Sequence, residues 1–337
     1  MTVIIITSAL KKIALLAFFI LLYGFVIFHP KDMHEVVNNS LRFCVNKLIP
    51  NVFPTMVLSS IFSDVLIANN CKKIKQSLIL LTLSSWLSGF VTGPKKLSDT
   101  SNGDDITAYA FLTSNASIGF TISLVGGCLW NSISFGIYLY VIQLLTSLLI
   151  FCFIKKTPPN NIKFVKKPLI SSLTISIKQS SLIMLEICGF TVVFSIINGI
   201  FSSIYSGELI KNVFAAILEI SEGVNSSVLT NNVNTAIFLT GFSVGFGGLC
   251  MCLQTFSVVN NNDISHIKFI MLKLLQGAIC GALCYAYSII FSIKKNNEIL
   301  TSINGELNIF SACIDAILMA FTLVYIKNFL KSKTNQR

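Results

Sequence analysis

Long apolar runs recur along this chain, and they constrain its fold more than any other feature. Charged residues make up 12% of the sequence, against about 25% in soluble domains, and the mean hydropathy is +0.76. A run of about 20 apolar residues can cross a bilayer as a helix. We therefore predict an all-α polytopic membrane protein with eight transmembrane helices, at 13–28, 51–68, 109–129, 132–153, 183–204, 236–259, 267–293 and 307–330.

Two further apolar segments end abruptly at polar or glycine residues. The segment 76–92 stops at Gly93 and Pro94, and the segment 209–218 stops at Glu219, Glu222 and Gly223. Lysine-rich loops favour the cytoplasmic side of a membrane, and the lysines at 72–75 and at 154–167 reach one side only if 76–92 turns back. We therefore predict two re-entrant segments, around 76–92 and 209–233, and place both termini in the cytoplasm.

The predicted elements repeat. An interfacial helix, a span, a re-entrant segment and two spans occur at 31–153 and again at 168–293, entering the membrane from opposite sides. A short sequence similarity supports the repeat, since 111–114 is Phe-Leu-Thr-Ser and 238–241 is Phe-Leu-Thr-Gly. Inverted repeats with broken helices are typical of secondary transporters. The predicted divisions are an N-terminal anchor (1–30), the first repeat (31–153), a basic cytoplasmic linker (154–167), the second repeat (168–293), and a C-terminal helix with a basic tail (294–337).

Motifs in the second repeat carry a family resemblance. Leu218-Glu219-Ile220-Ser221-Glu222-Gly223, Phe246-Gly247-Gly248-Leu249-Cys250 and the following Gln254 resemble the YlbJ-like sporulation integral membrane proteins of spore-forming bacteria. Those proteins contain nucleoside-transporter-type Gate domains, also called nucleoside recognition domains. The resemblance covers about 40–290; in the first repeat, 89–95 matches the family's turn with its proline displaced. It implies a multi-pass protein of the bacterial cell membrane with a role in spore cortex formation and no settled substrate.

Polar residues at predicted helix ends are the candidates for a substrate or ion site. Glu219 and Glu222 share one helix face and either bind a cation, a proton or a substrate group, or neutralise Lys95 or Lys96 across the repeat axis. Gly247 and Gly248 allow close helix packing or backbone contact with a ligand. Polar groups at membrane depth either line a site or satisfy carbonyls freed by a turn. The candidate residues are Glu219, Ser221, Glu222, Gly223, Thr92, Gly93, Lys95, Lys96, Thr113, Ser114, Asn115, Gly247, Gly248 and Gln254.

Several functional classes are disfavoured. The ten cysteines form no CxxC pair, and the three histidines make no metal set, so we expect no metal and no cofactor. Two arginines offer no cluster for phosphate, and we expect no nucleic-acid partner. Gly241-Phe242-Ser243-Val244-Gly245 lies in an apolar helix rather than at a nucleophile elbow, which argues against an enzyme.

The favoured interpretation is a transporter-like permease for a small polar solute or cation, which contacts the lipid bilayer. The alternative is a non-transporting scaffold bound to other sporulation membrane proteins. An intramembrane enzyme is the third and weakest hypothesis. The sequence does not identify the solute.

Overall fold

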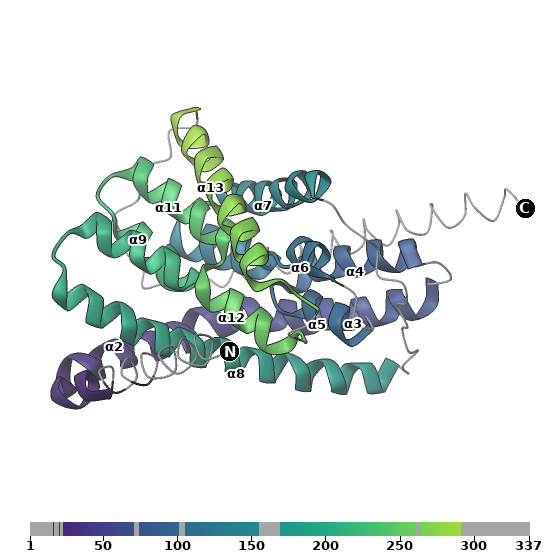
Figure 1. Ribbon diagram of the computed structural model, residues 1–337, viewed down its shortest axis with the longest axis horizontal. Coiled ribbons are helices and arrows are strands. Elements are labelled where there is room, and N and C mark those ends of the chain that lie inside the picture. The colour runs from purple at the N-terminus through teal and green to yellow at the C-terminus, as the bar shows by residue number, and fades with distance from the viewer. Residues whose placement is uncertain are drawn as a thin grey trace, which may run out of the picture.

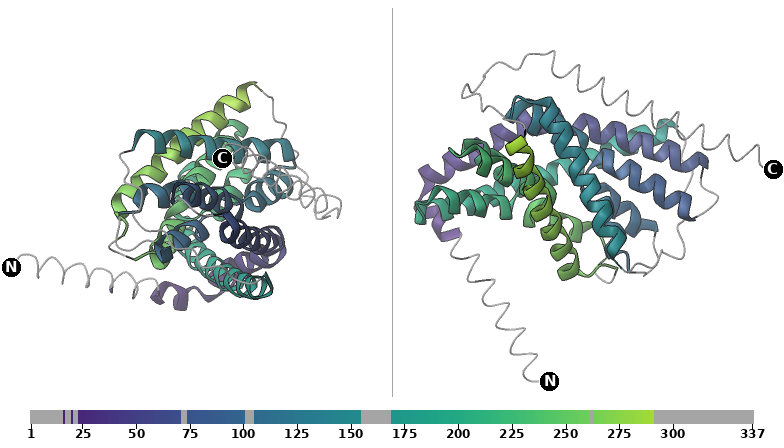
Figure 2. Two further views of the ribbon diagram at one scale, coloured as in Figure 1. Left: turned by 90° about the vertical axis from the view of Figure 1, so that its right-hand side faces the viewer. Right: turned by 90° about the horizontal axis from the view of Figure 1, so that it is seen from above.

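Helices and short connections make up the whole described part of the chain. The computed structural model describes residues 16, 20, 23–70, 74–100, 105–154, 169–260 and 263–290. Within these residues there are helices and no strand, so the predicted all-α fold is confirmed. The helices pack around one shared interior, seen from three directions in Figures 1 and 2.

The helices fall into two groups that follow one another along the chain. The first group is α2 (Pro30–Phe43), η1 (Cys44–Leu48), α3 (Ile49–Asn70), α4 (Ile74–Ser88), α5 (Thr92–Thr100), α6 (Thr107–Thr113), η2 (Gly119–Leu129) and α7 (Ile133–Phe153). The second group is α8 (Leu169–Ile204), α9 (Glu208–Leu218), α10 (Ile220–Leu229), α11 (Val233–Phe246), α12 (Gly248–Val258) and α13 (His266–Ile290). The predicted anchor is described only at 16, 20 and 23–30, where 23–28 is helical, and the basic linker (apart from residue 154) and the C-terminal helix lie outside the described residues.

Each group begins with a long, nearly uninterrupted helix. Helix α8 has 36 residues and extends about 54 Å at 1.5 Å per residue, well beyond the roughly 30 Å of a hydrocarbon core. It runs along the lower edge of Figure 1 and packs against α2 and α3. In the first group, α2, η1 and α3 follow without a break. The separate interfacial helices predicted at the start of each repeat are therefore continuous with the helices that follow them.

A pair of helices folds back on itself in each group. The chain turns at Gly89 between α4 and α5, with φ at +99°, and at Glu219 between α9 and α10. The turns predicted at Gly93 and Gly223 are therefore displaced, since both residues lie inside the second helix of the pair. Proline is tolerated in the first turn of a helix, so Pro94 does not end α5.

Gly93 and Gly223, where the two turns were predicted, make equivalent helix contacts. A Cβ at Gly93 would lie 2.6 Å from the Cβ atoms of Ser85 and Thr113, so α5 packs tightly on α4 and α6. At Gly223 it would lie 2.6 Å from Ala216 Cα and Ser243 Oγ, on α9 and α11. Thr113 and Ser243 thus occupy matching places. The sequence similarity between 111–114 and 238–241 aligns Thr113 with Thr240 rather than with Ser243. It therefore does not follow this structural correspondence.

Small residues hold α11 against α13. A Cβ at Gly241 would lie 2.6 Å from Cys284 Sγ, and one at Gly245 would lie 2.8 Å from Cys280 Cβ. From the other side, a Cβ at Gly277 would lie 2.8 Å from Phe246 Cβ. Small residues let membrane helices approach closely and gain dispersion contacts. The Gly-x-Ser-x-Gly sequence is therefore part of a packing surface, as the sequence predicted.

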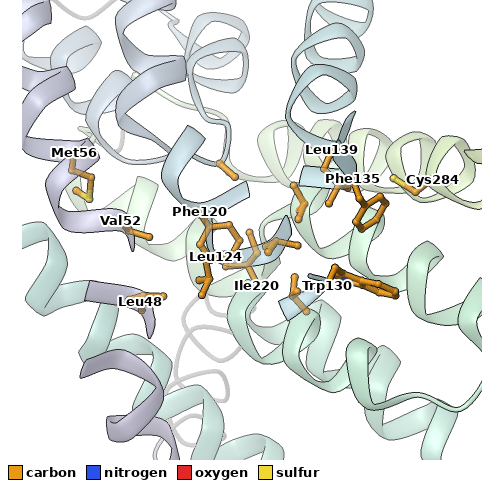
Figure 3. Packing of buried hydrophobic residues seen from close by; sticks show 14 of the residues in the cluster. Leu48, Val52, Met56, Phe120, Leu124, Trp130, Phe135, Leu139, Ile220 and Cys284 are labelled. Atoms are coloured by element: carbon orange, nitrogen blue, oxygen red, sulfur yellow. The ribbon is translucent and has the colours of Figure 1, made fainter. Parts of the chain in front are cut away.

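The largest apolar cluster joins the two groups of helices. In Figure 3 it runs from Met56 past Phe120 and Ile220 to Trp130 and Phe135, so α3, η2 and α10 meet in one core. Trp130 also donates from Nε1 to Thr240 Oγ1 of α11 at 3.2 Å. The middle of this cluster lies beside the places where the helices are interrupted.

Apolar side chains also face outward. Large exposed residues include Leu185 on α8 (71%) and Ile267 on α13 (75%), which a water-soluble surface rarely shows in such number. Within the described residues, four helices are long and apolar enough to cross a membrane: Ile133–Phe153, Ser172–Ile204, Val233–Val258 and His266–Ile289. These match four of the eight predicted spans. The predicted span 109–129 is instead broken between α6 and η2, and 51–68 lies within α3.

We expect Gly245→Leu to destabilise the protein by about 1 to 3 kcal/mol, because a leucine would overpack the contact with α13. Gly189→Leu on α8 is the control, since nothing lies within 4 Å of a Cβ at that position. Thermal unfolding of both purified variants in detergent measures the difference. Equal unfolding temperatures would contradict the close packing of α11 on α13.

Candidate functional site

A small cavity lies where the helix interruptions come together. Its walls include the turn between α4 and α5, the start of η2, the turn between α9 and α10, and α12. Its volume is about 50 Å³. The polar residues of the lining are Ser88, Thr92, Ser117, Glu219, Ser221 and Gln254, and the apolar ones come from the two turns and from η1, α3, η2, α8 and α12.

Glu219 carries the only charge on this lining, and it is 2% exposed. It is the N-cap of α10, where Oε2 accepts a hydrogen bond from the backbone N–H of Glu222 at 2.8 Å. A carboxylate at a helix N-terminus gains about 0.3 to 1 kcal/mol from the helix dipole, up to about 2 when partly buried. Burying an isolated ion costs several kcal/mol. The cap therefore offsets only part of the burial cost of this carboxylate.

Two more polar side chains on the lining are incompletely bonded. The Ser221 hydroxyl is buried and has no hydrogen-bond partner among the described residues. Gln254 donates from Nε2 to the Cys250 sulfur at 3.4 Å, and sulfur is a weak acceptor. Buried polar groups are nearly always bonded in native proteins, so the cavity has capacity for a polar occupant.

Glu222 has a different environment from Glu219. It is half-buried, and its Oε1 accepts a hydrogen bond from Ser195 of α8 at 2.6 Å. Ser195 also contacts Ser40 of α2 at 3.1 Å. Among the described residues, no salt bridge joins Glu219 or Glu222 to Lys95 or Lys96, whose side chains are half-buried on α5 and do not line the cavity. Lys95 and Lys96 therefore do not neutralise these two glutamates. Glu222 instead links α10 to α8 and, through Ser195, to α2.

The interruption between α6 and η2 is held by a buried lysine. Lys273 of α13 is fully buried, and its ammonium donates to the backbone carbonyl of Ser114 at 2.6 Å and to Gln276 Oε1 at 2.7 Å. The ammonium lies 5.5 Å from the ring centroid of Phe90 and 5.7 Å from that of Phe111. Cations are attracted to aromatic faces at such distances. The described part of the chain brings no carboxylate to ion-pair distance.

Side-chain amides bind the rest of this interruption. Gln276 donates from Nε2 to Asn115 Oδ1 at 2.8 Å and to the backbone carbonyl of Gln143 at 2.9 Å. Gln143 in turn bonds both backbone groups of Ala116, donating to its carbonyl at 2.8 Å and accepting from its N–H at 3.3 Å. The unwound residues 114–117 are therefore tied to α7 and α13. We call Lys273, Gln276, Gln143 and Asn115 the polar clamp.

The clamp residues on α7 and α13 were not predicted as site residues. Lys273, Gln143 and Gln276 lie inside predicted spans, where an ionisable residue is by default a functional candidate. A lysine within 267–293 was therefore a signal in the sequence. The interruption itself has no comparable signal, because 114–117 contains no glycine or proline.

The predicted candidates divide into two groups. Thr92, Glu219, Ser221 and Gln254 come together at the cavity, whereas Asn115 belongs to the clamp and the backbone carbonyl of Ser114 is bound by it. The remaining candidates lie at neither site through their side chains. Gly247 and Gly248, with φ at +82° and +78°, separate α11 from α12, and a Cβ at Gly248 would lie 2.9 Å from Glu219 Cα. They let α12 approach the turn that carries Glu219. Thr113 donates to the Tyr109 carbonyl within α6.

Comparison with family models, with curated proteins and with solved structures finds no match to this chain. The functional argument therefore depends on the cavity and the clamp themselves.

We expect Lys273→Met to destabilise the protein by about 1 to 3 kcal/mol, because methionine leaves the Ser114 carbonyl and Gln276 Oε1 without their donor. Lys268→Met is the control, since Lys268 is exposed on the same helix. Thermal unfolding in detergent measures both variants. A Lys273→Met protein as stable as the wild type would show that the ammonium does not hold the interruption.

Proposed function

We propose that this chain is a multi-pass permease of a bacterial cell membrane that binds a small polar solute or cation in its central cavity. The observation that carries the proposal is the Glu219 carboxylate, buried on the cavity wall without a compensating described cation. Intramembrane ionisable residues typically mark substrate or ion pathways. The adjoining Ser221 hydroxyl and Gln254 amide add polar groups to one small space.

The arrangement of the helices supports a transporter-like construction. Each group contains a long helix, a folded-back pair, an interrupted helix and a final long helix. The proposal interprets the folded-back pairs as re-entrant segments and the two groups as inverted repeats, with eight crossings and both termini in the cytoplasm. Interrupted helices that meet near the bilayer midplane are the usual binding sites of such folds.

The size of the cavity favours a small solute. An apolar cavity of about 150 Å³ accepts benzene, so the 50 Å³ available here is too small for a nucleoside in this conformation. The proposed solute is therefore of the size of an ion with a few water molecules, or a very small organic molecule. The family resemblance to nucleoside-type transporters thus does not decide the solute.

One observation favours the second function, a scaffold for sporulation membrane proteins. The polar clamp ties the first interruption firmly to α7 and α13, and a rigid interior suits a protein that does not move a solute. The two functions differ in whether purified protein alone moves a solute across a bilayer.

Uptake into proteoliposomes separates these functions. We expect the wild type to take up at least one member of a panel of metal ions, nucleosides and spore-core solutes. Glu219→Gln should lose most of this uptake, because it removes the charge on the cavity wall. Glu186→Gln, at an exposed position on α8, should retain it. Uptake of no member of the panel would favour the scaffold, whereas equal uptake by both variants would show that transport does not depend on the Glu219 charge.

The proposed topology is tested by cysteine labelling. Lys72 and Lys163 lie outside the described residues, and the lysine distribution predicts that both face the cytoplasm. In a cysteine-free background, Lys72→Cys and Lys163→Cys should both be protected from an impermeant reagent added outside intact cells. Labelling of position 163 from outside, with position 72 protected, would contradict a re-entrant segment at 76–92.

A further inference from the structure

The chemistry of the cavity wall selects a class of occupant. Glu219 is its one charged residue, and no lysine, arginine or histidine lines it. The dipole of α10 offsets only part of the burial cost of the carboxylate. A positively charged occupant would supply the missing compensation.

Neutral oxygen atoms surround the same space. The Ser88 and Thr92 hydroxyls hydrogen-bond each other, and each also lies within hydrogen-bond distance of a backbone carbonyl, Ser84 at 3.1 Å for Ser88 and Gly89 at 2.9 Å for Thr92. The two oxygens line the cavity as one hydrogen-bonded pair. Hydroxyl and amide oxygens, together with carboxylates, are the ligands that hard cations prefer.

Ser221 provides an independent indication of a ligand. Its side chain is 2% exposed and lines the cavity, and its hydroxyl lies close to the Glu219 carboxylate but makes no hydrogen bond of good geometry within the described residues. An unbonded hydroxyl at such depth is unusual. Glu219 and Ser221 both line this cavity.

We propose that Glu219, Ser221 and Gln254 form a binding site for one small monovalent cation. A single carboxylate balances a single positive charge. The described residues contain no group of three acidic, histidine or cysteine side chains that could hold a divalent metal. The cavity volume of about 50 Å³ accommodates an alkali ion or ammonium with a few waters. The inference deepens the proposed solute site, but the binding itself does not depend on transport.

The test is ion-dependent stability of the purified full-length protein. Thermal unfolding is measured in detergent while K⁺, Na⁺ or NH₄⁺ replaces N-methyl-D-glucamine at constant ionic strength. A ligand that binds only the folded state raises its unfolding temperature in a saturable way. The wild type should respond to at least one of the three cations, and the most effective one distinguishes an alkali ion from ammonium.

The variants connect the response to the site. Glu219→Gln should lose the response, and Ser221→Ala should raise the half-saturating concentration by about tenfold, as loss of one ligand contact predicts. Glu186→Gln, outside the cavity, should respond as the wild type does. If Glu219→Gln does not fold, Ser221→Ala and Gln254→Ala carry the test, and an unchanged response in both would overturn the proposal.

A wild type that responds to none of the three cations, or a Glu219→Gln protein that responds like the wild type, would also overturn it. Failure of this inference differs from failure of the proposed function. A saturable response that depends on Glu219, without uptake in proteoliposomes, would support the cation site and contradict the permease. Uptake without any cation response would support the permease and contradict the cation site.

Discussion

A helix that stops inside a membrane must find partners for the backbone groups that it frees, because lipid offers none. In the described part of this chain, helices are interrupted at four places, between α4 and α5, α6 and η2, α9 and α10, and α11 and α12, and each interruption frees such groups. The fold depends on satisfying them. In the first half, Gln143, Lys273 and Gln276 bond the unwound residues directly. In the second half, glycines allow close approach and Glu219 caps the following helix.

A charged group is buried at one interruption in each half, Lys273 between α6 and η2 and Glu219 between α9 and α10. The lysine has more compensating contacts than the glutamate. The Lys273 ammonium has two short hydrogen bonds and two aromatic rings around it. The Glu219 carboxylate has one backbone donor and faces a cavity. Phe90 connects the two environments, because its ring lies near the ammonium and also lines the cavity. The structure thus stabilises one interruption internally and leaves the other with room for a ligand, which is why the proposed site lies in the second half.

The sequence predicted most where local chemistry decides the outcome. Apolar length identified α7, α8, α11 and α13, and polar residues in apolar surroundings identified Glu219, Ser221 and Gln254 as neighbours of one site. It failed where tertiary contacts decide. Nothing local marks 114–117 as unwound, since its bonds come from residues far along the chain. The sequence predicted the turn between α4 and α5 at Gly93, because Pro94 suggested a helix end. The chain turns at Gly89 instead, because proline in the first turn of a helix costs no intrahelical hydrogen bond.

The central claim is that the interruptions meet around a cavity in which Glu219 needs a partner. An experimental density map that shows ordered water in the membrane interior tests it most directly. The account predicts density for an ion or water between the Glu219 carboxylate, the Ser221 hydroxyl and the Gln254 amide, with the Lys273 ammonium on the Ser114 carbonyl. A map in which Glu219 points to bulk solvent, or pairs with a lysine, would contradict it.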